Sequence, residues 1–110
     1  MVKRAPIPRR GDIWWLENAE MGRRPVMIVT RDSAIDVLTG IVVAPITRTV
    51  RNIDSEIRLD SDDGMPESCA ASFDNLRTVP RSMMVTKLTR LSTERLPEIC
   101  DAISFALECN

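Results

Sequence analysis

The sequence predicts a mainly β domain, a small and strongly bent antiparallel sheet or partly open barrel capped by one C-terminal helix. Three observations predict it. Short runs rich in β-branched or aromatic residues recur between turn-forming residues. Helical periodicity extends over a long segment only near the C-terminus. The chain has 110 residues, of which 44% are hydrophobic, which suits one core and therefore a single domain over residues 1–110.

The first half of the chain predicts three strands. They are 13–16 after the Gly11-Asp12 turn, 25–30, and 41–47. Pro45 lies within the third run and has no N–H to donate to a sheet, so we expect a bulge or an edge position there. Between the second and third strands, residues 32–39 leave room for one helical turn at most.

Further strands are expected at 55–59 and 71–76, where polar and apolar residues alternate. An acidic turn at 60–64 precedes Pro66 between them. Residues 84–91 alternate less regularly and follow a Pro80-Arg81-Ser82 turn, which predicts a sixth strand. Residues 1–9 are expected to form a flexible N-terminal extension.

The C-terminal helix is predicted over 93–108. Apolar residues at 96, 99, 100, 103, 106 and 107 have the spacing of one helical face. Ser92 is a good N-cap residue. Proline is tolerated only in a first helical turn, so the regular helix is expected to begin near Pro97, with a looser turn upstream.

Composition excludes several classes of protein. The sequence has no histidine and three widely spaced cysteines, Cys69, Cys100 and Cys109, which favours reduced thiols over a zinc site or a disulfide framework. No apolar run is long enough to span a membrane and the N-terminus does not resemble a signal peptide, so we expect a cytoplasmic protein.

The formal net charge of −1 conceals an uneven distribution. Residues 1–58 carry 10 basic and 7 acidic side chains, whereas residues 59–110 carry 5 basic and 9 acidic ones. This asymmetry could set a basic face against an acidic one, although solvated charge without a pattern is an equally good interpretation.

Four separated motifs occur in the order and at the spacing typical of the MazF/PemK toxin family. They are RGDIW at 10–14, GRRPV at 22–26, VAPIT at 43–47 and LRTV at 76–79. Leu91-Ser92, followed by an amphipathic helix, is also similar to that family. Each motif alone is common, but together they cover nearly the whole chain, and on them the sequence resembles this family.

The resemblance implies an SH3-like (MazF/PemK/CcdB-like) barrel of about five to seven antiparallel strands that forms a homodimer. It implies a toxin that cuts single-stranded RNA at short sequences without a metal or other cofactor. The ribose 2′-hydroxyl would be the nucleophile, leaving a 2′,3′-cyclic phosphate and a 5′-hydroxyl. A cognate MazE-like antitoxin would occupy the same grooves and inhibit the enzyme.

The resemblance assigns catalysis first to Arg24 and Thr47. A guanidinium can hold two phosphate oxygens while charge builds up at phosphorus, and a hydroxyl can donate a hydrogen bond to the transition state. Without the resemblance, the sequence alone would favour Arg24 as an ion-pair partner for nearby carboxylates and Thr47 as an ordinary strand residue.

The chain has neither histidine nor tyrosine, so the general base is a carboxylate, a lysine, or positioned water alone. Glu20 lies in the loop before Arg24, where many family members place a functional glutamate. Asp74 matches an acidic position that some members use in catalysis. Those members have an arginine two residues before the acid, where this sequence has Ser72. Pairing of Asp74 with Arg77 is the structural alternative.

RNA binding is expected from residues around Arg24 and Thr47. These are Arg23, Arg48, Arg51, Ser72, Arg77 and Trp14. Trp14 and Trp15 alternate along a strand, so one ring should face outward, either to stack on a base or to pack in a dimer interface. The loop from Glu17 to Arg23 is short, and an open groove would admit folded RNA such as tRNA or rRNA.

Two other functions fit the same fold. The first is a non-enzymatic poison of DNA gyrase similar to CcdB, which would not need the Arg24-Thr47 pair. Such poisons carry a C-terminal tryptophan, and this chain ends in ALECN. The second is an RNA-binding relative that has lost its activity.

Overall fold

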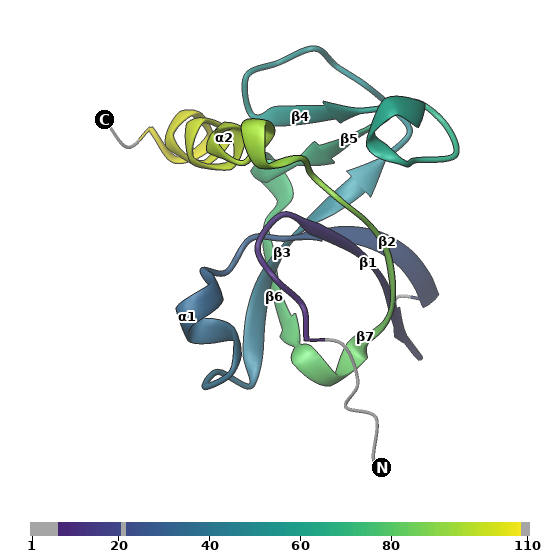
Figure 1. The fold of residues 1–110 in the computed structure, drawn as a ribbon, viewed down its shortest axis with the longest axis vertical. Coiled ribbons are helices and arrows are strands. Elements are labelled where there is room, and N and C mark those ends of the chain that lie inside the picture. The colour runs from purple at the N-terminus through teal and green to yellow at the C-terminus, as the bar shows by residue number, and fades with distance from the viewer. Residues whose placement is uncertain (1–6, 21, 109–110) are drawn as a thin grey trace.

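The computed structural model describes residues 7–20 and 22–108 and shows seven strands and a C-terminal helix (Figure 1). The strands are β1 (Asp12–Asn18), β2 (Gly22–Ile28), β3 (Gly40–Thr47), β4 (Glu56–Leu59), β5 (Cys69–Ser72), β6 (Arg77–Pro80) and β7 (Met84–Arg90). The α-helices are α1 (Asp32–Ile35) and α2 (Pro97–Leu107). Short 3-10 turns lie at Ser61–Asp63, Phe73–Asn75, Arg81–Met83 and Thr93–Arg95.

All the strand pairs are antiparallel, and they form one curled sheet in the order β4-β5-β3-β2-β1-β7. The remaining strand, β6, pairs with β3 on the same side as β5. The strands curl around a barrel-like interior, with α2 packed at one end (Figure 1). The predicted barrel-like β fold with a C-terminal helix is therefore confirmed.

The position of Pro45 differs from the expectation. The residue lies in a central strand with a regular register to β2, so it is neither at an edge nor in a bulge of that pairing. Along its other side, β3 pairs with β6 through residues 40–43 and with β5 through Ile46 and Thr47. Pro45 falls in the gap between these two partners, where no hydrogen-bond donor is required.

Both faces of the sheet are covered, which gives the molecule two hydrophobic cores. One core contains Ile13 and Met27 and packs against α2 through Ile99 and Ala102. The other contains Trp14, Leu16 and Val26. Side chains alternate between the faces of a strand, so neighbouring residues of β1 and β2 belong to different cores.

The C-terminal helix begins at Pro97, as its sequence predicts, and the residues before it form a 3-10 turn. The helix is therefore shorter than the expected 93–108. Ser92 precedes this turn without a side-chain capping hydrogen bond, so its expected role as N-cap of the helix is wrong. Of the expected extension 1–9, residues 1–6 lie outside the described residues, and Arg9 is held by a hydrogen bond from its N–H to Asp12.

Two elements were not as the sequence predicts. The segment expected as one strand at 71–76 leaves the sheet after Ser72 and turns through Phe73–Asn75. The chain then returns to pair with β3 as β6, a strand too short for its periodicity to be recognised. The turn and the new strand together place 72–77 beside the end of β3.

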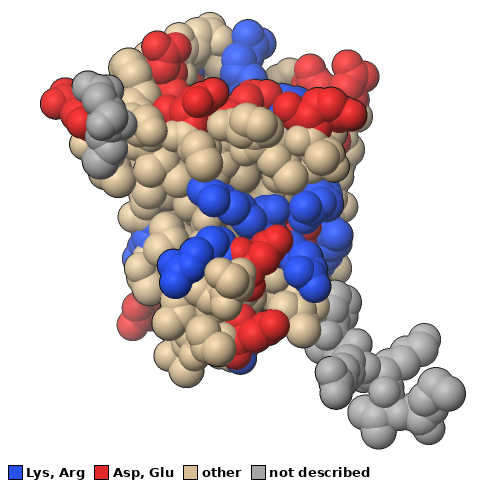
Figure 2. All heavy atoms as spheres, turned by 60° about the vertical axis from the view of Figure 1, so that its left-hand side comes forward, with Lys and Arg blue, Asp and Glu red and all other residues tan. Residues whose placement is uncertain are grey.

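Cys69 is buried and Cys100 is exposed, and both are free thiols. Cys109 lies outside the described residues. On the face shown in Figure 2, basic side chains form a belt below a band of acidic ones, so the two kinds of charge are partly separated there.

Candidate active site

The register between β2 and β3 brings Arg24 and Thr47 together. Val26 pairs with Pro45, and moving two residues outward along both antiparallel strands places Arg24 opposite Thr47. Residues two apart on a strand face the same side, and directly opposite residues are cross-strand neighbours. The two side chains therefore emerge on one face, next to the core of Trp14 and Leu16.

Arg24 and Thr47 both line a groove of about 850 Å³. Its sides come from the end of β3, the segment that follows it, and the turn between β5 and β6. The polar residues that line it are Arg24, Thr47, Arg48, Thr49, Arg51, Ser72, Asp74, Asn75 and Arg77. The structure therefore gathers seven of the residues singled out in the sequence into one groove.

Hydrogen bonds orient the hydroxyl of Thr47 and the carboxylate of Asp74. The Thr47 Oγ1 accepts a hydrogen bond from the Thr49 N–H at 3.1 Å, which leaves its own O–H free to donate to a ligand. The Ser55 hydroxyl donates to Asp74 Oδ2 at 2.6 Å. Asp74 thus has a partner other than Arg77, and its second oxygen remains available in an exposed side chain.

Three of the arginines that line the groove are not engaged in ion pairs in the described part of the chain. Within the described residues, Arg24, Arg51 and Arg77 form no ion pair with a carboxylate. Arg48 does pair with Glu67, at 2.8 Å between Nε and Oε1, but its side chain is 86% exposed. Unpaired guanidinium groups in a groove suit a phosphate backbone.

Ser72 contributes differently from the arginines. It is buried, and its Oγ accepts a hydrogen bond from the Asn75 side-chain amide at 2.9 Å. This bond spans the turn between β5 and β6. Ser72 therefore shapes the wall of the groove. It adds no positive charge at the position where some family members have an arginine.

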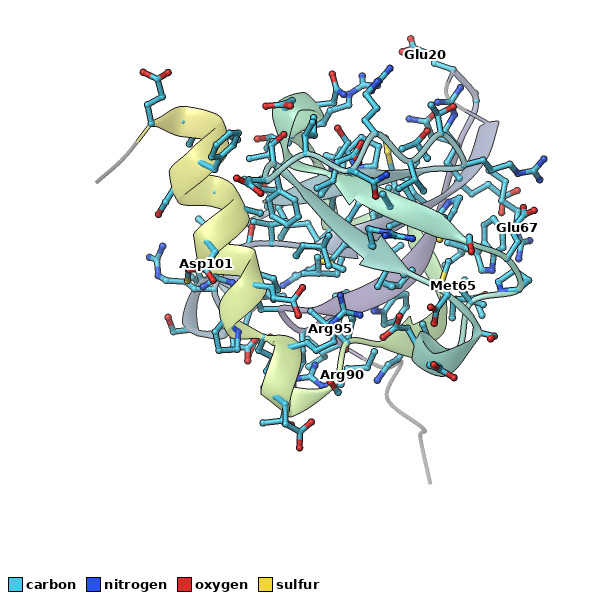
Figure 3. The ribbon with its side chains drawn as sticks, turned by 90° about the horizontal axis from the view of Figure 1, so that it is seen from above. Glu20, Met65, Glu67, Arg90, Arg95 and Asp101 are labelled. Atoms are coloured by element: carbon cyan, nitrogen blue, oxygen red, sulfur yellow. The ribbon has the colours of Figure 1, made fainter. Side chains whose placement is uncertain are left out.

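Three residues expected at the site lie elsewhere. Trp14 is only 3% exposed and packs in a core, so the expectation that its ring stacks on RNA is wrong. Arg23 points to the opposite face of β2 from Arg24, where its guanidinium lies 4.8 Å from the centre of the Trp15 ring. Glu20 is exposed in the β1–β2 turn and does not line the groove (Figure 3).

Thr49 and Asn75 also line the groove, although neither is predicted from the sequence. Thr49 could have been found from its position two residues after Thr47, because a threonine hydroxyl often accepts a hydrogen bond from the backbone N–H two residues later. Asn75 had no comparable signal, since its place in the groove depends on the turn that follows β5. Trp15 is the partly exposed ring of the tryptophan pair.

Within residues 7–20 and 22–108, no group of three or more histidine, cysteine or acidic side chains could hold a metal ion. In the same part of the chain, no helix has the length and apolar character needed to cross a membrane.

Comparison with known proteins identifies relatives over nearly the whole chain. Residues 9–107 match the family described as the PemK-like, MazF-like toxin of type II toxin-antitoxin systems. The probable endoribonuclease MazF5 of Mycobacterium tuberculosis is 40% identical over 105 residues, which cover 94% of this chain and 96% of the relative. The probable endoribonuclease MazF2 of the same species is 37% identical over 102 residues, covering 92% of this chain and 99% of that protein.

Solved structures agree with the fold. The Mycobacterium tuberculosis toxin MazF-mt6 superimposes with a TM-score of 0.81 at 30% identity, covering 90% of this chain and 98% of that one. A mycobacterial endoribonuclease, solved in complex with its cognate antitoxin, gives a TM-score of 0.82 at 20% identity, covering 94% of this chain and 97% of that one.

Proposed function

Since the chain belongs to the PemK-like, MazF-like toxin family, we propose that it is a sequence-specific endoribonuclease toxin whose catalytic site is the groove of Arg24 and Thr47. The observation that carries this proposal is the pairing of an uncompensated arginine with an oriented hydroxyl across β2 and β3. These groups suit a reaction in which negative charge builds up on phosphate oxygens.

The cleavage proposed here is a transesterification. The ribose 2′-oxygen attacks the adjacent phosphorus while its proton passes to a base, and the bond from phosphorus to the 5′-oxygen breaks. The products are a 2′,3′-cyclic phosphate and a 5′-hydroxyl, whose oxygen gains a proton. Arg24 would bind the non-bridging oxygens, and the Thr47 O–H would donate to one of them.

Asp74 is the groove carboxylate in a position to act as the base. Glu56 and Glu67 are not groove residues, and Glu20 lies on the β1–β2 turn. If Asp74 takes the 2′-hydroxyl proton, Asp74→Asn should slow cleavage by about 10²- to 10⁴-fold, while Glu20→Gln changes the rate less than tenfold. The opposite ranking would transfer the role of base to Glu20.

The proposal includes the biological setting of the family. The toxin would act as a homodimer in the cytoplasm, and a cognate antitoxin would block it by covering the groove. The connection between β1 and β2 is short, and its described residues, Ala19 and Glu20, do not line the groove. An open groove suits single-stranded RNA and also the exposed loops of tRNA or rRNA.

The proposed function is tested by incubating the purified protein with total RNA in the presence of EDTA and mapping the new ends. Discrete cuts with 5′-hydroxyl ends are expected, and Arg24→Ala should abolish them. Cuts that disappear with EDTA would contradict a metal-independent reaction. Cuts that survive in Arg24→Ala would show that the groove is not the catalytic site. Growth arrest by a Thr47→Ala variant without RNA cuts would instead favour a gyrase poison.

A further inference from the structure

A second pocket adjoins the catalytic groove on the opposite face of the sheet. It has a volume of about 370 Å³, within the range of pockets that bind small organic groups. Its floor is apolar and includes Met65, Cys69 and Leu88. Four polar or charged side chains join this lining, Arg23, Thr47, Arg48 and Glu67, and a few polar groups in a largely apolar pocket can fix the orientation of a ligand.

The strand register explains why the pocket forms at this place. Trp15 pairs with Pro25, and continuing the β2–β3 register places Pro25 opposite Ile46 and Arg23 opposite Arg48. These residues alternate with Arg24 and Thr47, so they face the other side of the sheet. One pair of strands thus supplies the catalytic groove on one face and this pocket on the other.

Trp15 and Arg23 form a wall suited to a nucleobase. Arg23 lies over the indole at 4.8 Å from the ring centre, and Trp15 is the partly exposed tryptophan of the pair. An indole ring and a guanidinium plane both stack on bases. The pocket therefore combines an aromatic surface, an adjacent positive charge and an apolar floor.

The pocket and the catalytic groove share Ile46, Thr47 and Arg48 at the end of β3. A nucleotide whose phosphate lies at Thr47 can therefore place a neighbouring base over the strand end and into the pocket. Arg48 lies between the two sites, where its guanidinium can contact the connecting backbone.

Glu67 gives the pocket a means of choosing among bases. It is the carboxylate of the lining, it is 54% exposed, and it pairs with Arg48 at the rim. Figure 3 shows Glu67 and Met65 at the same side of the molecule. A carboxylate only accepts hydrogen bonds. Guanine presents two adjacent donors, N1–H and N2–H, along one edge and is the base that matches a carboxylate most fully.

We propose that the pocket of Trp15, Arg23 and Glu67 is a base-recognition subsite that holds a guanine next to the scissile phosphate. The proposal rests on the endoribonuclease function. Trp15 and Arg23 stack the base, and Glu67 reads its donor edge. Replacing Glu67 by glutamine, which offers one donor and one acceptor, should shift the preference toward adenine.

The experiment uses the full chain and a random-sequence RNA library, with sequencing of the 5′-hydroxyl ends. The wild type should show guanine enriched at one position near the cut. Glu67→Gln should reduce the preference for guanine over adenine at that position by about tenfold and leave other positions unaltered. Glu94→Gln is the matched control, because Glu94 is exposed and lines neither pocket.

Binding to an uncleavable RNA oligonucleotide, with a 2′-deoxyribose at the cut, tests the stacking wall. Trp15→Leu should weaken binding by about 5- to 150-fold, and Trp15→Phe should retain most of it. A base profile that is unchanged in Glu67→Gln, while Arg24→Ala abolishes cutting, would refute the subsite alone. Absence of wild-type cuts would refute the proposed function itself. A Trp15→Leu protein that elutes as a smaller species would show that a second copy covers this pocket.

Discussion

Asp12 is a buried carboxylate, and we expect its replacement to lower the stability of the fold substantially. Its side chain is 2% exposed, and four groups from the N-terminal segment, β1 and β7 surround it. Oδ2 accepts from the Arg9 N–H at 2.9 Å and from the Trp14 Nε1–H at 3.2 Å. Oδ1 lies 2.8 Å from Arg90 Nη1 and 3.6 Å from Lys87 Nζ.

Asp12→Ala removes the acceptor of two N–H groups and leaves two cations without their partner. Arg90 and Lys87 are 37% and 42% exposed, so water can partly solvate them. The indole N–H of Trp14 is buried, so water cannot replace the lost acceptor. A buried unsatisfied donor costs about 1–3 kcal/mol. When the loss of the charge-assisted hydrogen bond between Asp12 and Arg90 is added, we expect the free energy of unfolding to fall by about 3–5 kcal/mol.

Asp12→Asn preserves the shape and one acceptor, and it should cost about 1.5–3 kcal/mol. Urea denaturation followed by circular dichroism, at one fixed protein concentration, measures both losses without screening the ion pairs. Asp101→Ala, at an exposed position of α2 (Figure 3), is the control and should stay within about 0.5 kcal/mol. A loss below about 1 kcal/mol for Asp12→Ala would refute the reasoning, because the cost of burying the carboxylate would then cancel its interactions.

Three further predictions concern single positions. Thr47→Ala should lower the single-turnover cleavage rate about hundredfold while Thr47→Ser retains most of it, and equal rates in both variants would exclude the hydroxyl from catalysis. Gly64 has φ +85°, and an added Cβ would lie 2.5 Å from Thr89 Oγ1. Gly64→Ala should therefore cost about 1–3 kcal/mol in urea denaturation, and an unchanged midpoint would contradict this. Burial raises the pKa of the Cys69 thiol, and the nearby carboxylate of Glu67 adds to the effect. Less thiolate is present at a given pH, so iodoacetamide at pH 8 should modify Cys69 more slowly than Cys100, and equal rates in peptide mass spectra would contradict the assignment.

Much of the fold follows from local sequence. The β-branched or aromatic runs at 13–16 and 41–47 lie in β1 and β3, the run expected at 25–30 belongs to β2 only as far as Ile28, and Pro97 marks the start of the helix. These features depend on backbone preferences within a few residues. The motifs around Arg24 and Thr47 also indicated, through the resemblance to the family, which two residues to expect at the site, and the register of β2 and β3 in the structure brings them together.

Tertiary structure decided which side of each strand faces the groove. A sheet covered on both faces has no solvent side, so alternation alone cannot tell that Trp14 is in a core and Trp15 on a pocket wall. The same alternation separates Arg23 from Arg24. The place of Asp74 beside Thr47 depends on the return of the chain through β6, a pairing between segments more than 30 residues apart. Local sequence determines which residues can form strands, whereas only the pairing of the strands in the curled sheet determines which of their side chains meet.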